Sequence, residues 1–393
     1  MSKKTLFNIG PFHPLQEEAE FFQLTVDGER VVEADVRISY NHRGIEKLSE
    51  SKTFDQVPFL IERVCGICSA SHPLAYIQAV EDIAHVDVPP RAKYLRTIVN
   101  ELERIHSHML WLGLAGHFLG YNTVFMWAWK YREPIMDVLE IATGSRVNYA
   151  NCKIGGVRRD MTAEQLESVL KVMDETEKAV DMLTKAVLDD PVLHARLKGV
   201  GRLKTADARL YGAVGPTGRA SGLAIDTRKD DPYAAYDQMD FKLITAPDGD
   251  VFSKAVVRCL ETIESIKIIR QAIRRIPGGP IDARVDAIPP GEAVGHVEAP
   301  RGETFHYVRS DGSNYPVRHK VRAPSYMNVP TFRTSVVGGE IADAALTLAS
   351  VDPCYSCTER LIRVVDAGTR KPLYDFNDLL RLSREKTERI RRS

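Results

Sequence analysis

Hydrophobic positions recur with different periods along the chain, and each period predicts a different element. Apolar and polar residues alternate over residues 21–40 around Asp27-Gly28, which is typical of a β-hairpin closed by a tight turn. From Pro89 to about Gly120 the apolar positions recur every three or four residues, which predicts a long amphipathic helix. The positions of this apolar seam are Leu95, Ile98, Leu102, Ile105, Met109 and Leu112.

Two further long helices are predicted by their end signals. Thr162 followed by Gln165 forms a capping box, so a helix should begin there and stop before Pro191. Another helix should cover residues 250–276 and end at the Pro-Gly-Gly sequence that follows. The middle of the chain is therefore expected to be mainly helical.

The last third of the chain returns to strand patterns. Residues 281–323 are strand-like, with turns at Gly302 and at a later Asp-Gly pair. A strand pair is expected around Gly368, followed by a charged helix capped by Asn377 or Asp378. Small antiparallel sheets are therefore expected to come from the two ends of the chain.

The predicted fold class is α+β: a central bundle of long helices with small antiparallel β-sheets. The chain shows no internal repeat and no low-complexity linker, so we expect one domain over residues 1–393. Within it we distinguish a β-rich N-terminal part (1–60), a mainly helical core (61–280), a β-rich part (281–360) and a C-terminal extension (361–393).

Composition and charge argue against several classes of protein. The 53 basic side chains equal the 53 acidic ones, so no nucleic-acid partner is expected. The most apolar stretch, residues 109–129, is interrupted by glycine, histidine and asparagine and does not predict a membrane span. Residues 1–10 show no secretory signal. Any link to a membrane is therefore expected to come through partner subunits.

Four of the six cysteines form two CxxC pairs, Cys65 with Cys68 and Cys354 with Cys357. Two thiolates separated by two residues can close on one metal, and four of them suit a soft or borderline metal. A structural zinc site has the same donors, and spacing within the pairs does not exclude it. Zinc ribbons, however, place their pairs about 15–20 residues apart, whereas nearly 300 residues separate these.

The residues that flank the cysteines carry a family resemblance. Arg43-Gly44-Ile45-Glu46, sixteen residues, then Arg63-x-Cys65-Gly66-x-Cys68-x-x-x-His72 is one matching segment. Asp352-Pro353-Cys354-x-x-Cys357-Thr358-x-Arg360 is another, and residues 298–302 and 322–325 also match. These segments resemble the large subunit of nickel–iron hydrogenases, specifically the energy-converting, membrane-bound group related to respiratory complex I.

The resemblance implies a nickel–iron hydrogenase large-subunit fold with the metal centre between loops from both ends of the chain. All four cysteines would bind nickel, and Cys68 and Cys357 would also bridge to an iron that carries carbon monoxide and cyanide. The implied activity is reversible heterolytic production or oxidation of H2. It would use electrons from a low-potential donor, passed through iron–sulfur clusters, and would be coupled to ion translocation.

The same resemblance suggests residues around the metal. Arg301 would supply a permanent, directional positive charge, and Asp352 would lie near it. His72 would hydrogen-bond a bridging sulfur, while Ser325 and the backbone of Pro324 match the cyanide-binding position. Without the family these would be an ion-pair arginine, an ordinary buried histidine and turn residues.

A proton-transfer carboxylate is also implied. Glu18 aligns best with that position, and Glu17 is the competing assignment. A carboxyl in a dry site has a raised pKa and can exchange its proton near neutral pH. A solvated acidic run is the alternative interpretation of these two residues.

The chain departs from the best-known hydrogenases after the last cysteine. They have a histidine that ligates magnesium or iron together with the glutamate equivalent to Glu46. Here that position is Arg360, a cation that cannot ligate a metal, so a magnesium or iron ion at Glu46 is doubtful. We hypothesise that Arg360 pairs with Glu46 instead. Residues after 360 are cleaved in some relatives; their strand–turn–helix pattern favours retention here.

Partners follow from the same resemblance. Cys152 and Cys259 are isolated, so the chain has no cysteines left for an iron–sulfur cluster. A small subunit with a 4Fe–4S cluster, a ferredoxin-like iron–sulfur subunit and integral membrane ion-translocating subunits are therefore expected, with maturation proteins for nickel insertion. The expected location is the cytoplasmic face of the cell membrane. The donor (ferredoxin, formate or carbon monoxide) and the ion (proton or sodium) stay open.

Two rival functions share parts of these motifs. The quinone-site subunit of complex I shares residues 10–14, 42–47 and 215–222, but it lacks the set of four thiolates. A zinc-stabilised assembly subunit would keep the thiolates without hydrogen chemistry. Metal analysis separates the three possibilities: nickel with iron, no metal, or zinc alone.

Overall fold

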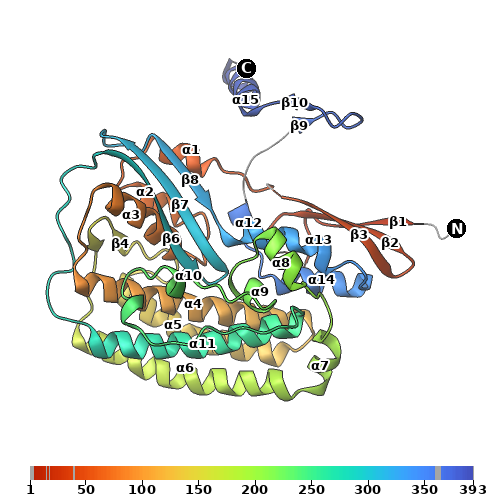
Figure 1. The fold of residues 1–393 in the computed structure, drawn as a ribbon, viewed down its shortest axis with the longest axis horizontal. Helices are drawn as coiled ribbons and strands as arrows, with labels where there is room; N and C mark the ends of the chain where they lie inside the picture. Colours follow the sequence, from red (N-terminus) through yellow and green to blue (C-terminus); the bar gives the residue numbers. More distant parts are fainter. Residues whose placement is uncertain (1–3, 15, 17, 39, 359–363, 393) are drawn as a thin grey trace.

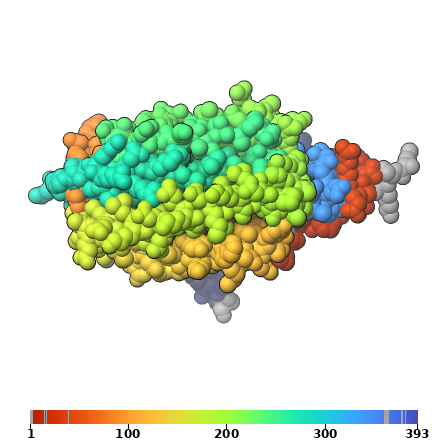
Figure 2. Space-filling model, turned by 90° about the horizontal axis from the view of Figure 1, so that it is seen from below, coloured from red at the N-terminus to blue at the C-terminus, as the bar shows by residue number. Residues whose placement is uncertain are grey.

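Four long helices lie side by side in the lower half of the molecule (Figure 1). They are α4 (Pro90–Phe118), α5 (Asn122–Thr143), α6 (Ala163–Asp189) and α11 (Val251–Arg275). In the view from below, the bands of α11, α6 and α5 run next to one another across this face (Figure 2). This computed structural model describes residues 4–14, 16, 18–38, 40–358 and 364–392.

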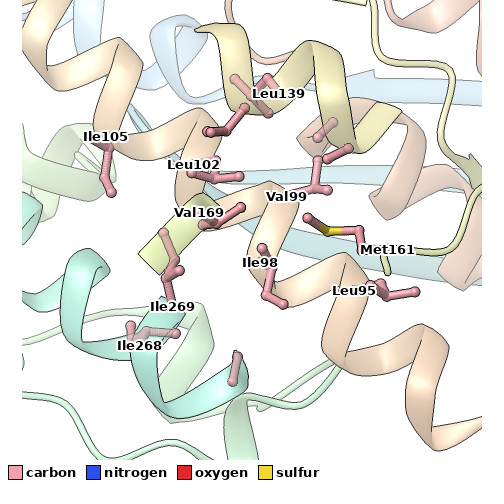
Figure 3. Packing of buried hydrophobic residues seen from close by; sticks show 14 of the residues in the cluster. Leu95, Ile98, Val99, Leu102, Ile105, Leu139, Met161, Val169, Ile268 and Ile269 are labelled. Atoms are coloured by element: carbon pink, nitrogen blue, oxygen red, sulfur yellow. The ribbon is translucent and has the colours of Figure 1, made fainter. Parts of the chain in front are cut away.

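The apolar seam of α4 forms the centre of the bundle, as its periodicity predicts. Leu95, Ile98, Leu102 and Ile105 are each fully buried. They pack among side chains of the three neighbouring helices, namely Leu139 from α5, Val169 from α6, and Ile268 and Ile269 from α11 (Figure 3). The α+β architecture with a central bundle of long helices is confirmed.

The predicted start of α6 is confirmed in detail. The Thr162 side chain accepts a hydrogen bond from the Gln165 N–H at 3.2 Å, and the Gln165 side chain accepts from the Thr162 N–H at 2.8 Å. These two bonds satisfy N–H groups that have no partner inside the helix. The end is also as predicted, because Asp190 precedes Pro191 and its carboxylate caps the next helix.

Replacing Thr162 by alanine is expected to lower the free energy of unfolding by about 1 kcal/mol, the usual loss for an N-cap hydroxyl. Urea unfolding followed by circular dichroism measures it. The matched control is Thr184→Ala near the other end of α6, a hydroxyl with no capping bond. An unchanged midpoint in the Thr162 variant would contradict the capping role.

Several elements escaped prediction. Among them are α3 (Ser71–Ile83), α5 and the edge strand β1 (Thr5–Ile9). In α3 eleven of the thirteen residues are buried, so no polar face exists to mark a helical period. In α5 Pro134 interrupts the helical signal.

Shorter helices connect these elements. They are α1 (Ile45–Ser49), α2 (Val57–Ile61), α7 (Pro191–Leu197), α8 (Thr205–Tyr211), α9 (Gly215–Arg219), α10 (Thr227–Asp230), α12 (Pro324–Asn328), α13 (Phe332–Ser335) and α14 (Ile341–Ser350), with 3₁₀ turns at Tyr236–Gln238, Val329–Thr331 and Tyr355–Thr358.

Two three-stranded antiparallel sheets flank the bundle. The predicted hairpin forms β2 (Phe21–Asp27) and β3 (Arg30–Arg37), with β1 added at its edge. The strand-like segment after 281 forms β6 (Pro290–Ala299), β7 (Gly302–Asp311) and β8 (Arg318–Arg322). A short pair, β4 (Cys152–Lys153) with β5 (Gly156–Val157), completes this part.

The β6–β7–β8 sheet lies directly on α3, and a glycine makes this approach possible. A Cβ at Gly295 would come within 2.0 Å of the Ala75 carbonyl oxygen. At the β6–β7 turn, Gly302 has a φ of +124°, which side chains rarely adopt. Only glycine at both places lets β6 pass close to α3 and turn at residues 300–301.

The C-terminal segment forms the predicted strand pair and helix. β9 (Val364–Val365) pairs with β10 (Pro372–Tyr374), and α15 (Phe376–Arg392) follows. The predicted cap was wrong: Asp375 precedes the helix and accepts from the Asp378 N–H at 2.9 Å, so neither Asn377 nor Asp378 is the cap. Among the described residues, no helix combines the length and the hydrophobicity needed to cross a lipid bilayer.

A partly exposed ion cluster joins β6, β7, β8 and the residue that follows α10 (Thr227–Asp230). His296 lies 2.8 Å from Asp231 and 3.2 Å from Glu303. The hydrogen bond to Glu303 raises the pKa of His296. The pKa of Glu303 is lowered to about 2 by His296 and by Arg322.

This cluster predicts a pH dependence of stability. The His296 contribution is complete below its unfolded pKa of about 6.5 and is lost as the pH rises through the raised folded value. The Glu303 contribution is present above about pH 4.5 and is lost as the pH falls towards about 2. We therefore expect His296→Phe to cost up to about 1 kcal/mol near pH 5.5 and less at pH 8.5, since the group is partly exposed. Urea midpoints at the two pH values measure the difference, and equal losses would contradict it.

Candidate metal centre

The two CxxC pairs meet in the interior although they come from opposite ends of the chain. Cys65 and Cys68 lie in the loop between α2 and α3, and Cys354 and Cys357 follow α14. The Sγ atoms of Cys354 and Cys65 are 3.2 Å apart, and those of Cys354 and Cys357 are 2.7 Å apart. The ligand atoms of Cys65, Cys354 and Cys357 all lie within 4.8 Å of one another.

Local hydrogen bonds shape both turns. The Cys68 N–H points at Cys65 Sγ at 3.3 Å, and the Cys357 N–H donates to the Cys354 carbonyl at 3.1 Å. Asp352, just before the second pair, has a φ of +57°, which reverses the chain after α14. The turns thereby bring the sulfurs of Cys65, Cys354 and Cys357 together, with Cys68 next to Cys65.

Arg43 joins the two turns from outside. Its guanidinium donates to the carbonyls of Arg63 at 2.6 Å and Val64 at 3.1 Å, and it lies 3.5 Å from the Ser356 carbonyl. One side chain thus bridges both cysteine loops. This is a structural reason for arginine at the start of the Arg-Gly-Ile-Glu segment.

The four thiols form a coupled, fully buried set. The pKa of Cys65 lies well below its usual range because Cys354, Cys357 and Cys68 donate hydrogen bonds to its sulfur. The pKa values of the other three thiols lie well above it, because each faces a neighbouring sulfur and burial penalises a second charge. A divalent cation would remove that penalty, since thiolates bind it in the deprotonated form. The donor set therefore fits a soft or borderline metal such as nickel or iron.

Arg301 lies against the first pair. Its Nη1 is 3.7 Å from Cys68 Sγ, its Nη2 is 2.7 Å from the Asp352 carboxylate, and its Nε donates to the Asp352 carbonyl at 2.9 Å. Burial opposes the charge, but Asp352 and the cysteine sulfurs raise the pKa of Arg301 well above its usual value. The guanidinium is therefore a permanent, oriented positive charge beside the sulfurs.

Two buried arginines, one through backbone carbonyls and one through ion pairs, hold the turn that carries Arg301. Arg104 on α4 donates to the carbonyls of Ala299 at 3.1 Å and Glu298 at 2.5 Å. Arg219 on α9 binds the Glu298 carboxylate at 2.7 Å and that of Glu261 at 2.6 Å. The turn is thus fixed from two sides, which orients the guanidinium without loop motion.

His72 and Ser325 complete the surroundings of the second pair. His72 Nε2 lies 3.9 Å from Cys357 Sγ. Ser325, which follows Pro324 at the start of α12, accepts a hydrogen bond from the Cys354 N–H at 3.0 Å. The structure therefore brings these sequence-selected residues to the cysteines.

Comparison with known proteins places this arrangement in a family. The family model described as respiratory-chain NADH dehydrogenase, 49 Kd subunit, matches residues 119–288 and 284–360, and that of nickel-dependent hydrogenase matches residues 43–114. The membrane-bound hydrogenase subunit alpha of Pyrococcus furiosus is 41% identical over 97% of this chain and 93% of its own length. The carbon monoxide-induced hydrogenase of Rhodospirillum rubrum is 41% identical over 90% and 98%.

The chain belongs to the large subunits of energy-converting, membrane-bound nickel–iron hydrogenases.

The fold of this large subunit also recurs in a solved respiratory complex. A chain of the membrane-bound sulfane sulfur reductase, described as an archaeal respiratory membrane complex, superposes with a TM-score of 0.87 at 32% identity. The match covers 91% of this chain and 98% of that one. The match to the 49 Kd family confirms the kinship with complex I.

The N-terminal loop of the large subunit reaches the second cysteine pair. The Glu18 carboxylate accepts a hydrogen bond at 2.6 Å from the N–H of Ser356, which lies between the two cysteines of that pair. Glu17, the competing residue, lies outside the described residues. Of the two carboxylates, Glu18 is the one that the structure describes, and it lies beside the second cysteine pair.

The predicted partner of Glu46 cannot be compared with the structure, because Arg360 lies outside the described residues. The Glu46 carboxylate binds Lys320 Nζ at 2.8 Å and the Val321 N–H at 2.9 Å. The pair between Arg360 and Glu46 stays a prediction.

Sequence reasoning missed one buried carboxylate close to the centre. Glu103 on α4 accepts hydrogen bonds from the N–H groups of Ala70 at 2.5 Å and Ser71 at 3.2 Å, and from the Ser71 hydroxyl. It thereby caps α3 directly after the first cysteine pair. Burial raises the pKa of Glu103 to about 8. The available signal was an acidic residue between the seam positions Leu102 and Ile105.

Proposed function

We propose that this large subunit catalyses the reversible heterolysis of dihydrogen at a nickel–iron centre held by Cys65, Cys68, Cys354 and Cys357. The observation that carries the proposal is the meeting of two CxxC pairs from opposite ends of the chain beside a buried arginine. When bound, the metal pair supplies the site where dihydrogen is split and its electrons are taken up.

The protein's own residues would prepare that site. Arg301 would hold a positive charge against Cys68, and it costs no reorganisation because Asp352 already fixes its guanidinium. His72 would donate to Cys357. The iron would carry carbon monoxide and cyanide, with Ser325 and the Pro324 backbone beside the cyanide.

Proton exchange would use the N-terminal loop. Glu18 accepts a hydrogen bond from the Ser356 N–H in the turn of the second pair, and this contact supports it as the acid–base group next to the sulfurs. A carboxyl in this position can exchange a proton with the centre and with water.

Electrons would leave through partner subunits. Cys152 and Cys259 are separately buried, and each has a pKa raised by that burial, to about 12 and about 11. Such inert thiols do not build a cluster. We therefore infer a small subunit with a 4Fe–4S cluster, a ferredoxin-like subunit and ion-translocating membrane subunits, with maturation proteins that insert nickel. Relatives named as membrane-bound support a position at the membrane, which we place on its cytoplasmic face.

Reaction with a quinone is the second candidate, because the 49 Kd family model covers most of the chain after residue 119. Infrared spectroscopy of the purified complex, together with nickel and iron analysis, separates the two. Hydrogenase function predicts nickel and iron together with infrared bands of bound carbon monoxide and cyanide. An active complex without nickel, or with zinc alone, would overturn the proposal.

A further inference from the structure

Three buried histidines form a continuous chain from the metal centre towards α1. His72 Nδ1 lies 3.0 Å from His306 Nε2, and His306 Nδ1 lies 2.9 Å from His319 Nε2. His319 Nδ1 in turn lies 2.8 Å from the Ser49 hydroxyl. All three rings are at most 1% exposed. They come from α3, β7 and β8, so the sheet that rests on α3 supplies two of them.

In a series of hydrogen-bonded imidazoles, the tautomer of one ring determines the tautomer of the next. A neutral imidazole has one N–H donor and one acceptor nitrogen, so the choice in one ring decides the choice in the next. At the inner end His72 Nε2 faces Cys357 Sγ at 3.9 Å, and a thiolate that binds a metal can only accept. The proton must then be on Nε2 in all three rings, with His319 Nδ1 accepting from Ser49.

The same atoms can also form the opposite series of hydrogen bonds, in which the N–H groups point away from Cys357. The Ser49 hydroxyl donates a hydrogen bond to the Glu46 carbonyl at 2.7 Å, and it must rotate away from that oxygen to donate to His319. While it donates to Glu46, it accepts from His319, and His72 then turns a lone pair towards Cys357. Two electron-rich atoms would face each other in a dry site, which is unfavourable next to a thiolate. A metal-bound Cys357 therefore selects the polarity that points N–H groups inwards.

We propose that His306 and His319 are positioning residues for the metal centre: acting through His72, they keep an N–H on the Cys357 sulfur. This inference rests on the proposed function, because it requires Cys357 to be a metal ligand. The two histidines never touch the centre themselves. Their contribution is to hold the ring orientation and the tautomer of the one histidine that does.

Loss of this hydrogen bond is expected to change the electron density on the iron. A hydrogen bond from His72 would withdraw electron density from the Cys357 sulfur that holds the metal, and its loss would leave more density on the iron. More density on the iron weakens the bond of a bound carbon monoxide. Loss of the donor should therefore move the carbon monoxide stretching band to lower wavenumber.

The test compares variants of the whole purified complex by infrared spectroscopy, with nickel and iron content measured for each. His306→Phe keeps a ring of similar shape and removes both hydrogen bonds of that position. The control is His296→Phe on the neighbouring strand, whose partners are Asp231 and Glu303. We expect the band to fall in the His306 variant and to stay in place in the control. In His306→Gln the amide can still donate to His72, so the band should fall less than in His306→Phe.

Epistasis distinguishes positioning from a merely structural effect. If His306 acts only through His72, the double variant His72→Phe with His306→Phe should show the same band position as His72→Phe alone. Additive shifts, or an unmoved band in a metal-loaded His306 variant, would overturn the inference. Absence of the bands from the unaltered complex would instead overturn the proposed function on which it rests.

A measurement without any variant covers the case in which His306→Phe does not fold. Nitrogen-15 NMR of the metal-loaded complex, labelled only at histidine, reports which ring nitrogen carries the proton. Protonation at Nε2 of His306 supports the inference, and protonation at Nδ1 alone overturns it.

Discussion

Replacement of Cys68 by serine is expected to abolish hydrogen turnover. Cys68 is 2% exposed and lies under the Arg301 guanidinium. Serine offers a hard oxygen with a high pKa in place of a soft thiolate, so it is a poor ligand for the metal that we propose Cys68 binds. We expect hydrogen uptake with an artificial electron acceptor to fall below detection, together with a loss of nickel or iron from the purified complex.

The matched control for this prediction is Cys152→Ser. Cys152 is also buried, at 7% exposure, and it lies in β4 and does not belong to the group of sulfur atoms formed by the two pairs. It should keep its metal and its turnover, with only a modest loss of stability. Undiminished turnover in the Cys68 variant would refute the assignment of that sulfur to the metal.

Arg301→Lys is expected to lower turnover by about 10²–10³-fold, the usual effect of removing one preorganised electrostatic contact. Lysine keeps the charge that compensates Asp352, so the fold should survive. Its single ammonium cannot reach Cys68, Ser107 and the Asp352 carboxylate together, as the guanidinium does. The loss should therefore appear in the turnover rate and not in the metal content.

Arg309→Lys serves as the control, because Arg309 is an exposed arginine on the neighbouring strand β7. Turnover, metal content and thermal unfolding should be measured for both variants under the same conditions. A rate within twofold of the unaltered complex in Arg301→Lys would show that an undirected positive charge is enough. A loss of metal would show that the arginine is structural.

Long helices with a regular apolar seam or a clear end signal were predictable, and elements without either signal were not. The seam of α4 and the capping box of α6 depend on neighbouring residues only, so their spacing is visible in the sequence. α3 has almost no exposed face, and its helical period is therefore invisible. The cap of α15 was misplaced by a few residues because aspartates at positions 375 and 378 satisfy similar local rules.

The cysteines and Arg301 could be selected from the sequence because their motifs match a family, and the structure brings them together. The residues that hold these side chains in place could not be selected from the sequence. Arg104 and Glu103 have no motif, and Arg219 lies in the segment 215–222, whose resemblance assigns it no role. Their roles appear only once α4 and α9 are packed against the β6–β7 turn and the start of α3.

The sequence by itself determined the chemistry of the centre and the class of the fold, since ligand type, helical period and capping are properties of neighbouring residues. The tertiary structure alone decided what surrounds the sulfurs. His72 and His306 are separated by 234 positions and still share a hydrogen bond, because α3 and the β7–β8 sheet bury a common face. Such contacts depend on how whole elements pack, and no spacing along the chain contains them.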